Sequence, residues 1–442
     1  MTDSLTSPDP SAGPSGPGAA AAGRPPHPGH PRPTRVYGPA IAGDPDRLYT
    51  ALRREYGPVA PVLLDGDVPA WFVLGYREVS HVTGNPRLFA RDCRRWNAWD
   101  LIPDDWPLMP YVGWTPSVMF AEGPEHRRRA GAIGDALDAV DRTELADLCA
   151  EVSDGLIDAF AGRGRADLVE EFALRVPLLV MAQLYGLPPA DIPALVADIA
   201  ESLDSGEKAA AAHGRIHARM QGLVADRNRR PGLDVPSRLL RHPAGLTEDE
   251  VVIDLLVVMA AAQQPTGNWI GNTLRLMLTD DRFSVTLQGG RSSIKQALGE
   301  VLWENTPTQN FIGRWAVQDC KLGEQHIRGG DLVVLGLAAA NTDPDVCPRD
   351  RAPDPQPAGP DGNQAHMSFG NGEHGCPFPA PELAEVIART AVEVLLDRLP
   401  DVELAVPVPS LRWRPSVWMR GLFELPVAYT PSGGGPAGDG GR

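Results

Sequence analysis

Apolar residues recur every three or four positions over long stretches of this chain, and this spacing predicts amphipathic helices. Stretches with this spacing run over 45–56, 124–140, 142–162, 168–185, 188–203, 207–229, 247–279, 293–305 and 381–398. Strand patterns are fewer and lie at 59–64, at 70–74 and within 311–335. The pattern therefore predicts a mainly α (α+β) fold, rich in helices and with small sheets.

The two ends of the chain differ in composition from the rest. Residues 1–34 are rich in Pro, Gly, Ala and Ser and have no periodic apolar pattern, and residues 431–442 resemble them. Such segments bury too little apolar surface to offset the entropy of ordering the backbone. We expect two disordered tails around a folded region at 35–430.

Composition and charge narrow the class of protein. The 442 residues, 43% of them hydrophobic, fit one large globular domain or two small ones. A net charge of −16 disfavours nucleic acid as a partner. No apolar run approaches the roughly 20 residues of a membrane span, and the first residues lack the layout of a signal peptide. We expect a cytoplasmic monomer that does not enter a membrane.

The cysteines argue against a disulfide framework and against a zinc site. They are odd in number and widely spaced, and no two of them form a C-x-x-C pair. A reducing compartment fits this usage best. The five positions are Cys93, Cys149, Cys320, Cys347 and Cys376.

One string, Phe369-Gly-Asn-Gly-Glu-His-Gly-Cys376, combines glycines, a histidine and a cysteine just ahead of an apolar helix. Gly370 and Gly372 permit positive φ, so this loop can fold tightly. Pro381 suits the first turn of the helix that follows. The Cys376 thiol would then lie near a helix N-terminus, where the dipole lowers a cysteine pKa.

This string resembles the haem-binding loop of the cytochrome P-450 superfamily, the haem-thiolate oxygenases. The resemblance covers about residues 36–430 and implies that fold, with haem b as the cofactor and Cys376 as the axial ligand of its iron. It also implies that Phe369, Gly370 and His374 lie at the cofactor, with His374 donating to a propionate. The alternative is that Cys376 only packs in the protein.

The resemblance implies two further contacts to the haem propionates. His126 lies in a Pro-Glu-His segment like that of the family, but the family's arginine four residues later is Ala130 here. Arg129 or Arg127 is expected to compensate. Arg314 matches a basic residue of the family, and such side chains can clamp carboxylates. For His126 and Arg314 the alternative is a surface or capping role.

A long predicted helix resembles the one that crosses the haem face in this family, where a small-residue pair, an acid and a threonine open an oxygen groove and deliver protons. Here the pair is Ala261 and Ala262, while Gln264 stands at the acid's position and Pro265 at the threonine's. Neither of these two can supply a proton. Water, a substrate hydroxyl or Thr266 must do so. Thr266 is turned by about 100° from its neighbour, so it serves only if the helix is distorted.

Pro265 gives a reason for such distortion, because a proline inside a helix leaves the carbonyl of Ala261 without its N–H partner. That carbonyl could hold a water or a substrate group. The alternative is a kink with no chemical role.

The segment Glu300-Val-Leu-Trp303 stands where the family has Glu-x-x-Arg, and it resembles a bacterial subgroup that carries Glu-x-x-Trp. A buried carboxylate without its partner costs several kcal/mol, so Glu300 needs another cation. Arg349 and Arg351 are the expected candidates, and Trp303 could stack on that guanidinium.

The residues directly after Cys376 also differ from the pattern of the family. The family usually has a glycine where this chain has Phe378, and Pro377 and Pro379 have no N–H group. Fewer amides can therefore donate to the sulfur, and we expect a lowered reduction potential of the iron.

The segment 96–114 holds four of the ten tryptophans and three prolines. By resemblance it falls where the family places the loop that caps the substrate pocket. Its aromatic side chains either line a cavity for a bulky apolar ligand or pack the loop.

The resemblance implies a haem-thiolate monooxygenase or oxidative tailoring enzyme for a bulky small-molecule substrate. Electrons would come from a separate ferredoxin and ferredoxin reductase, because the sequence shows no flavin or dinucleotide fingerprint. One alternative is a non-catalytic or regulatory haem-binding protein with regulatory partners of the sensor or small-GTPase type. Another is a haem-thiolate protein that uses peroxide or couples radicals.

Overall fold

The computed structural model of the chain describes residues 33–38, 41, 43–103, 105–202, 207–284, 291–346 and 364–431. The segments expected to be disordered lie almost entirely outside these residues, as do Cys347, Arg349 and Arg351. A short strand already begins at Thr34.

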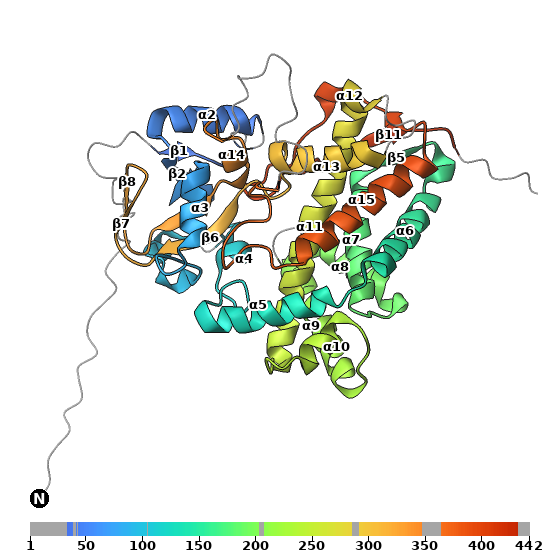
Figure 1. Cartoon of the computed structure of the whole chain (residues 1–442), viewed down its shortest axis with the longest axis horizontal. Helices are drawn as coiled ribbons and strands as arrows, with labels where there is room; N and C mark the ends of the chain where they lie inside the picture. Colours follow the sequence, from blue (N-terminus) through green and yellow to red (C-terminus); the bar gives the residue numbers. More distant parts are fainter. Residues whose placement is uncertain are drawn as a thin grey trace, which may run out of the picture. The chain divides into compact units, whose positions relative to one another are not determined.

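Helices dominate the described chain, as the apolar periodicity predicts (Figure 1). They are α2 (Pro45–Tyr56), α3 (Tyr76–Gly84), α4 (Met109–Val112), α5 (Gly123–Asp138), α6 (Arg142–Asp158), α7 (Arg175–Leu184), α8 (Ile192–Ser202), α9 (Glu207–Arg229), α10 (Val235–Arg241), α11 (Glu248–Thr279), α12 (Asp281–Ser284), α13 (Arg291–Glu304), α14 (Leu337–Asn341) and α15 (Ala380–Arg398). The predicted helix at 168–185 is divided into a π-helical turn, Val169–Ala173, and α7. Periodicity did not predict α3 or α10, which are short.

The strands of the described residues form three sheets. Their bounds are β1 (Thr34–Arg35), β2 (Val59–Leu64), β3 (Val68–Val73), β4 (Phe89–Ala90), β5 (Arg165–Asp167), β6 (Phe311–Ala316), β7 (Cys320–Leu322), β8 (Gln325–Ile327), β9 (Leu332–Leu335), β10 (Glu403–Leu404) and β11 (Pro426–Ala428). The largest sheet has the order β1-β2-β3-β9-β6-β4, and the others are β10-β11-β5 and β7-β8. In the largest sheet, β6 runs antiparallel to β9, and Arg314 stands opposite Val333.

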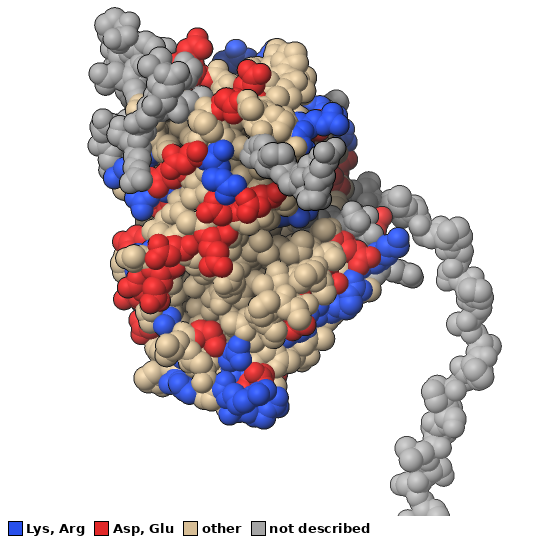
Figure 2. Space-filling view, turned by 90° about the vertical axis from the view of Figure 1, so that its right-hand side faces the viewer, with Lys and Arg blue, Asp and Glu red and all other residues tan. Residues whose placement is uncertain are grey.

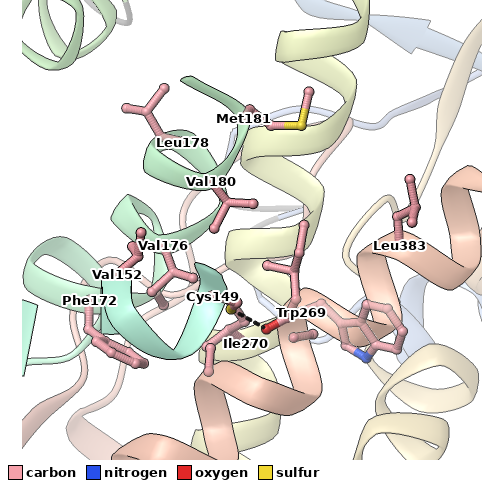
Figure 3. Packing of buried hydrophobic residues seen from close by; sticks show 14 of the residues in the cluster. Cys149, Val152, Phe172, Val176, Leu178, Val180, Met181, Trp269, Ile270 and Leu383 are labelled. Carbon is pink, nitrogen blue, oxygen red and sulfur yellow. Dashed lines mark hydrogen bonds between the residues drawn. The ribbon is translucent and has the colours of Figure 1, made fainter. Parts of the chain in front are cut away.

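Helix α11 runs through the main apolar core, where it packs against α7, α9, α13 and α15. It begins at a capping box, in which Thr247 and Glu250 each bond the other's backbone N–H. Figure 3 shows side chains of α6, α7, α11 and α15 meeting in this core. Cys149 on α6 is buried there and donates to the carbonyl of Ile387 on α15 at 3.3 Å. This cysteine therefore has a structural role.

The tryptophan-rich segment packs against itself and against the apolar cluster next to the largest sheet. Trp96 lies 5.0 Å from Trp99, 5.8 Å from Trp106 and 6.2 Å from Trp315, measured between ring centroids. Trp96 and Trp106 are buried. Trp114 is exposed, and the guanidinium of Arg94 lies 4.5 Å from its ring centroid. For Trp96, Trp99 and Trp106 the structure supports the packing alternative.

Acidic side chains gather on the face shown in Figure 2, which is the right-hand side of Figure 1 and includes α6 and α15. On α6, carboxylates that are at least partly exposed recur every three or four residues: Glu144, Asp147, Glu151, Asp154 and Asp158. Residues at this spacing share one side of a helix. This surface would repel an acidic partner. Among the described helices, none combines the length and the apolar character needed to cross a membrane.

Candidate haem site

The loop that ends at Cys376 is folded as its glycines predict. Gly370 and Gly372 have φ values of 71° and 73°, a region that disfavours side chains. A Cβ on Gly372 would come within 2.3 Å of the carbonyl oxygen of Thr83, so this position also lacks space. The N–H of Cys376 donates to the carbonyl of Phe369 at 2.8 Å and closes the loop.

The sulfur of Cys376 is accessible but is set among protein atoms. Its side chain is exposed, and α15 begins four residues later at Ala380. Desolvation raises the pKa of the Cys376 thiol to about 11, whereas the helix dipole was expected to lower it. Burial therefore favours the neutral thiol, and a bound metal ion would favour the thiolate.

Three residues predicted to contact propionates come together beside this loop. The rings of His126 on α5 and His374 lie 3.9 Å apart between centroids. Arg314 on β6 is only 2% exposed, and its one side-chain hydrogen bond to a described residue goes to the Gly313 carbonyl. The Nδ1 atom of His126 lies 3.8 Å from the Glu373 carboxylate, is buried, and has no hydrogen-bond partner among the described residues.

Two buried arginines, Arg314 and Arg91, contribute positive charge around His374. Burial lowers the pKa of Arg314 to about 10. Burial also lowers the pKa of His374 to about 2, and His126, Arg314 and Arg91 add charge repulsion. Such a field favours an anion, because an anion would compensate the buried cations.

Arg91 belongs to this cluster, although the sequence did not single it out. It is buried, and its guanidinium donates to the carbonyls of Ile312 and Gly313 at 3.0 and 2.7 Å and to that of Met119 at 2.8 Å. Arg91 thereby supports the backbone next to Arg314. These partners are more than 25 residues distant in the chain, so no local motif marks the contact.

The residues present fit a haem. Among the described residues, Arg314 has no carboxylate within ion-pair distance, and a buried cation of this kind is costly without a partner. The two propionates of a haem would supply carboxylates to Arg314, His126 and His374. The accessible thiol of Cys376 offers one soft donor of the type that binds haem iron.

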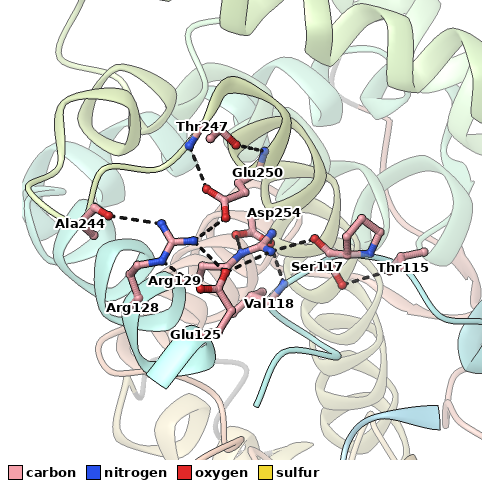
Figure 4. A network of polar contacts seen from close by, with 11 residues as sticks. Thr115, Ser117, Val118, Glu125, Arg128, Arg129, Ala244, Thr247, Glu250 and Asp254 are labelled. Atoms are coloured by element: carbon pink, nitrogen blue, oxygen red, sulfur yellow. Dashed lines mark hydrogen bonds and ion pairs between the residues drawn. The ribbon is translucent and has the colours of Figure 1, made fainter. Parts of the chain in front are cut away.

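Arg129, one of the two arginines expected at a propionate, is bound to α11 and to the segment before α5. Its Nε and Nη2 atoms donate to Asp254 on α11 at 2.8 and 2.6 Å, and Nη1 donates to the carbonyl of Pro116 at 2.8 Å (Figure 4). Each of its three nitrogens thus makes one hydrogen bond within the protein, and two of these bonds go to α11. Arg127 is exposed and pairs with Glu373 at 3.3 Å.

Helix α11 runs without interruption through Pro265. Ala261 is exposed although it lies in the middle of this core helix, and Gln264 and Pro265 are half-buried. Residues four apart share a helix face, so Ala261 and Pro265 lie on the accessible side. Thr266 is only 4% exposed, and Ala262 packs against the main core. The helix is not distorted in the way that Thr266 would need in order to reach the accessible side.

Glu300 on α13 finds its cation on another helix. The Nη2 atom of Arg282 on α12 lies 2.5 Å from Glu300 Oε1. Arg349 and Arg351, the expected candidates, lie outside the described residues. Trp303 packs edge-on against His366, with ring centroids 5.9 Å apart.

A scan against models of protein families finds no match. A vitamin D(3) 25-hydroxylase of Pseudonocardia autotrophica is 29% identical over 398 residues, which are 88% of this chain and 94% of that protein. The biflaviolin synthase CYP158A1 of Streptomyces coelicolor is 30% identical over 400 residues, which are 87% of this chain and 93% of that protein. Among solved structures, testosterone-bound CYP154C4 of Streptomyces sp. ATCC 11861 matches with a TM-score of 0.79 and 27% identity, covering 90% of this chain and 99% of that one.

Proposed function

This chain belongs to the cytochrome P-450 superfamily of haem-thiolate monooxygenases, and we propose that it oxidises a bulky organic molecule at a haem bound by Cys376. The observation that carries the assignment of the site is the exposed Cys376 close to the buried Arg314, which has no carboxylate within ion-pair distance among the described residues. The relatives named above are a hydroxylase of vitamin D(3), a synthase of biflaviolin and a structure with bound testosterone, and these names support a bulky substrate.

Different residues of the chain would bind different parts of the haem. Cys376 would ligate the iron, His126, His374 and Arg314 would hold the propionates, and Gly370 would let the loop pass close to the ring. The bound haem supplies oxygen activation, which its thiolate ligand promotes.

On the accessible side of α11, the small side chain of Ala261 leaves room next to the cofactor. Pro265 has no N–H group, so the carbonyl of Ala261 lacks its helical donor and can accept from a water or a substrate hydroxyl. Gln264 can donate to and accept from that same molecule, but it has no titratable proton. We propose that protons reach the site through a water held by these groups.

Electrons are proposed to come from a separate ferredoxin and ferredoxin reductase. The described residues form one helix-rich fold, and their sheets do not include the parallel nucleotide-binding sheet of a fused reductase. Phe378 is 68% exposed and lies two residues after Cys376, so a protein partner has access to this loop.

The site assignment is tested by the spectrum of the reduced protein with carbon monoxide. Wild-type protein should show the long-wavelength Soret band of a thiolate ligand, and Cys376→Ala should abolish it. Cys149→Ala, which removes a buried cysteine on α6, is the control and should keep the band. A wild-type band in Cys376→Ala would overturn the assignment.

The activity is tested with ferredoxin, its reductase and NAD(P)H, after a binding-shift screen with steroids, macrolides and polycyclic aromatic compounds. We expect a product that depends on substrate. Peroxide as the sole product with every bound compound would instead favour a non-catalytic haem protein.

A further inference from the structure

We propose that the guanidinium groups of Arg275 and Arg420, which both lie against the ring of Trp413, bind a phosphate group. The inference goes beyond the proposed function, because none of these residues belongs to the haem site described above. A phosphate group bound here would be a ligand in addition to haem and substrate.

Trp413 brings the two arginines together. The guanidinium carbon of Arg420 lies 3.7 Å from the centroid of the Trp413 ring, and that of Arg275 lies 5.2 Å from it. Both distances are within the range of cation–π interactions. Arg275 comes from the C-terminal half of α11, whereas Trp413 and Arg420 come from the segment 413–422. Two like charges from distant parts of the chain therefore lie against one ring, where they repel each other.

The segment 413–422 forms a hairpin that sets the positions of Trp413 and Arg420. Trp413 pairs with Leu422 as an antiparallel bridge, and the N–H of Arg414 donates to the Gly421 carbonyl at 2.9 Å. Arg420 directly precedes Gly421, so its side chain belongs to the arm that faces Trp413. The contact between the ring and the guanidinium group is therefore a contact across the hairpin.

The backbone of Arg420 is also fixed to the rest of the protein. Nδ2 of Asn272 on α11 donates to the Arg420 carbonyl at 2.9 Å, and the N–H of Arg420 donates to the Pro307 carbonyl at 2.8 Å. Asn272 is fully buried and lies three residues before Arg275, and residues at this spacing are neighbours on a helix. The two guanidinium groups are therefore held near each other before any ligand binds, which lowers the entropy lost on binding.

Neither guanidinium group has an oppositely charged partner within ion-pair distance among the described residues. Arg420 is 9% exposed, and its side chain makes no hydrogen bond to any of them. The Nε atom of Arg275 is buried and also lacks a hydrogen-bond partner there. Desolvation lowers the pKa of Arg420 to about 10 and lowers the pKa of Arg275 as well. A buried cation without a partner is costly, so a bound anion would stabilise this part of the protein.

Three carboxylates act on these arginines, but only at longer range. Asp44 and Asp46 around the start of α2 oppose the lowered pKa of Arg420, and Glu304 at the end of α13 does so for Arg275. None of the three forms an ion pair with either arginine in the described part of the chain. The contact positions on both guanidinium groups are therefore left to a ligand.

A phosphate group matches the charge and the shape of this pair. It carries about −1.5 to −2 charges at neutral pH, and its oxygens can accept from both guanidinium forks at once. A carboxylate has one charge, so it compensates only one of the two arginines. Arg275 and Trp413 are half-buried, so the site opens to the surface and a small ligand can enter. The group could come from inorganic phosphate or from a phosphate ester.

The chain offers a matched control next to the same hairpin. The guanidinium carbon of Arg412 lies 5.4 Å from the centroid of the Phe423 ring, and both residues are exposed. Arg412 thus makes a cation–π contact like that of Arg275, but without burial and against a different ring. Arg412→Gln removes one positive charge and one such contact and leaves Arg275 and Arg420 in place.

The test is isothermal titration calorimetry of the haem-bound protein with inorganic phosphate, at an ionic strength kept constant with sodium chloride. In this form the haem propionates would already compensate Arg314. We expect one saturable site per chain in the wild type and in Arg412→Gln. Arg420→Gln and Arg275→Gln should each weaken binding at least about tenfold, because a charged hydrogen-bond donor is lost. Arg420→Lys keeps the charge without the fork and should bind with intermediate affinity.

Thermal unfolding gives an independent readout of the same site. Phosphate should raise the Tm of the wild type and of Arg412→Gln relative to chloride, because it binds only the folded protein. It should leave the Tm of Arg420→Gln and of Arg275→Gln unchanged. Far-UV circular dichroism shows that each variant is folded.

Two other anions identify the class of ligand. Glycerol phosphate bound more tightly than inorganic phosphate would assign the site to a phosphate ester, and equal or weaker binding would assign it to the free ion. Acetate should bind more weakly than either. Absence of saturable phosphate binding to the wild type, wild-type affinity in Arg275→Gln and Arg420→Gln, or tighter binding of acetate would overturn the inference. The thiolate band of the carbon monoxide complex tests the proposed function separately, so the two failures can be told apart.

Discussion

Arg129 and Asp254 form a buried bidentate ion pair that joins α5 to α11, with N–O distances of 2.8 and 2.6 Å. Asp254 also accepts from the N–H of Val118 at 2.8 Å, and Arg129 donates to the carbonyl of Pro116. The pair therefore fastens the segment before α5 to the helix that crosses the proposed haem site.

Removing one partner of this pair should be costly. Asp254 is fully buried, and desolvation raises its pKa although Arg129 opposes the shift. We expect Asp254→Ala to lower the free energy of unfolding by about 3–5 kcal/mol, because a buried cation is left unpaired. Urea unfolding of the haem-bound protein measures this.

The control is the double variant Arg129→Met/Asp254→Leu, which removes both charges and keeps most of the volume. It should be more stable than Asp254→Ala, since replacing a whole buried pair by apolar residues is often neutral. A loss below about 1 kcal/mol for Asp254→Ala, in the range of exposed pairs, would contradict this view of the pair.

Much of the fold could be predicted from apolar periodicity. The helices at 45–56 and 207–229 have the predicted bounds, and those at 248–279 and 380–398 differ by one residue. The positive φ of Gly370 and Gly372 also followed from residue type alone. These features are local, so the sequence near each residue determines them.

The partners of charged side chains could not be predicted in the same way. Arg129 was expected at a propionate and is bound to Asp254, 125 residues away, while Glu300 pairs with Arg282 on a neighbouring helix. Arg91 was missed because it contacts residues from the other half of the chain. Such pairings depend on how the helices and sheets pack, and no local spacing encodes that.

Gly372 gives a second prediction, on the cysteine loop. Gly372→Ala should destabilise the haem-bound protein by more than about 2 kcal/mol, because alanine disfavours positive φ and its Cβ would overlap the Thr83 carbonyl. Gly155→Ala is the control, since Gly155 lies within α6 with open space around it. That variant should be stabilised by about 0.5–1 kcal/mol. Equal effects of the two variants in urea unfolding would show that the loop tolerates a side chain.

Replacing Arg314 should stabilise the protein without haem but weaken its hold on haem. Arg314→Met should stabilise the haem-free protein by about 1–3 kcal/mol, because a buried cation without a carboxylate is replaced by an apolar side chain. The same variant should release haem to apomyoglobin about tenfold faster, because a charged contact to a propionate is lost. Thermal unfolding without haem and the transfer rate with haem measure the two effects. Unchanged haem release would remove Arg314 from the proposed propionate site.

Gln264 and Pro265 give the prediction that bears most directly on the proposed relay. Gln264→Glu with Pro265→Thr introduces a titratable acid and a hydroxyl on the accessible side of α11, and proton transfer by positioned groups contributes about 10²–10⁴-fold in enzymes. We expect product formation per NAD(P)H consumed to rise several-fold and peroxide release to fall. The control is Gln263→Glu, one residue away, because the Gln263 amide is bound to the Leu174 carbonyl at 3.2 Å. If Gln263→Glu improves coupling as much as the double variant, added negative charge on the helix explains the gain, and the relay through Gln264 and the Ala261 carbonyl is wrong.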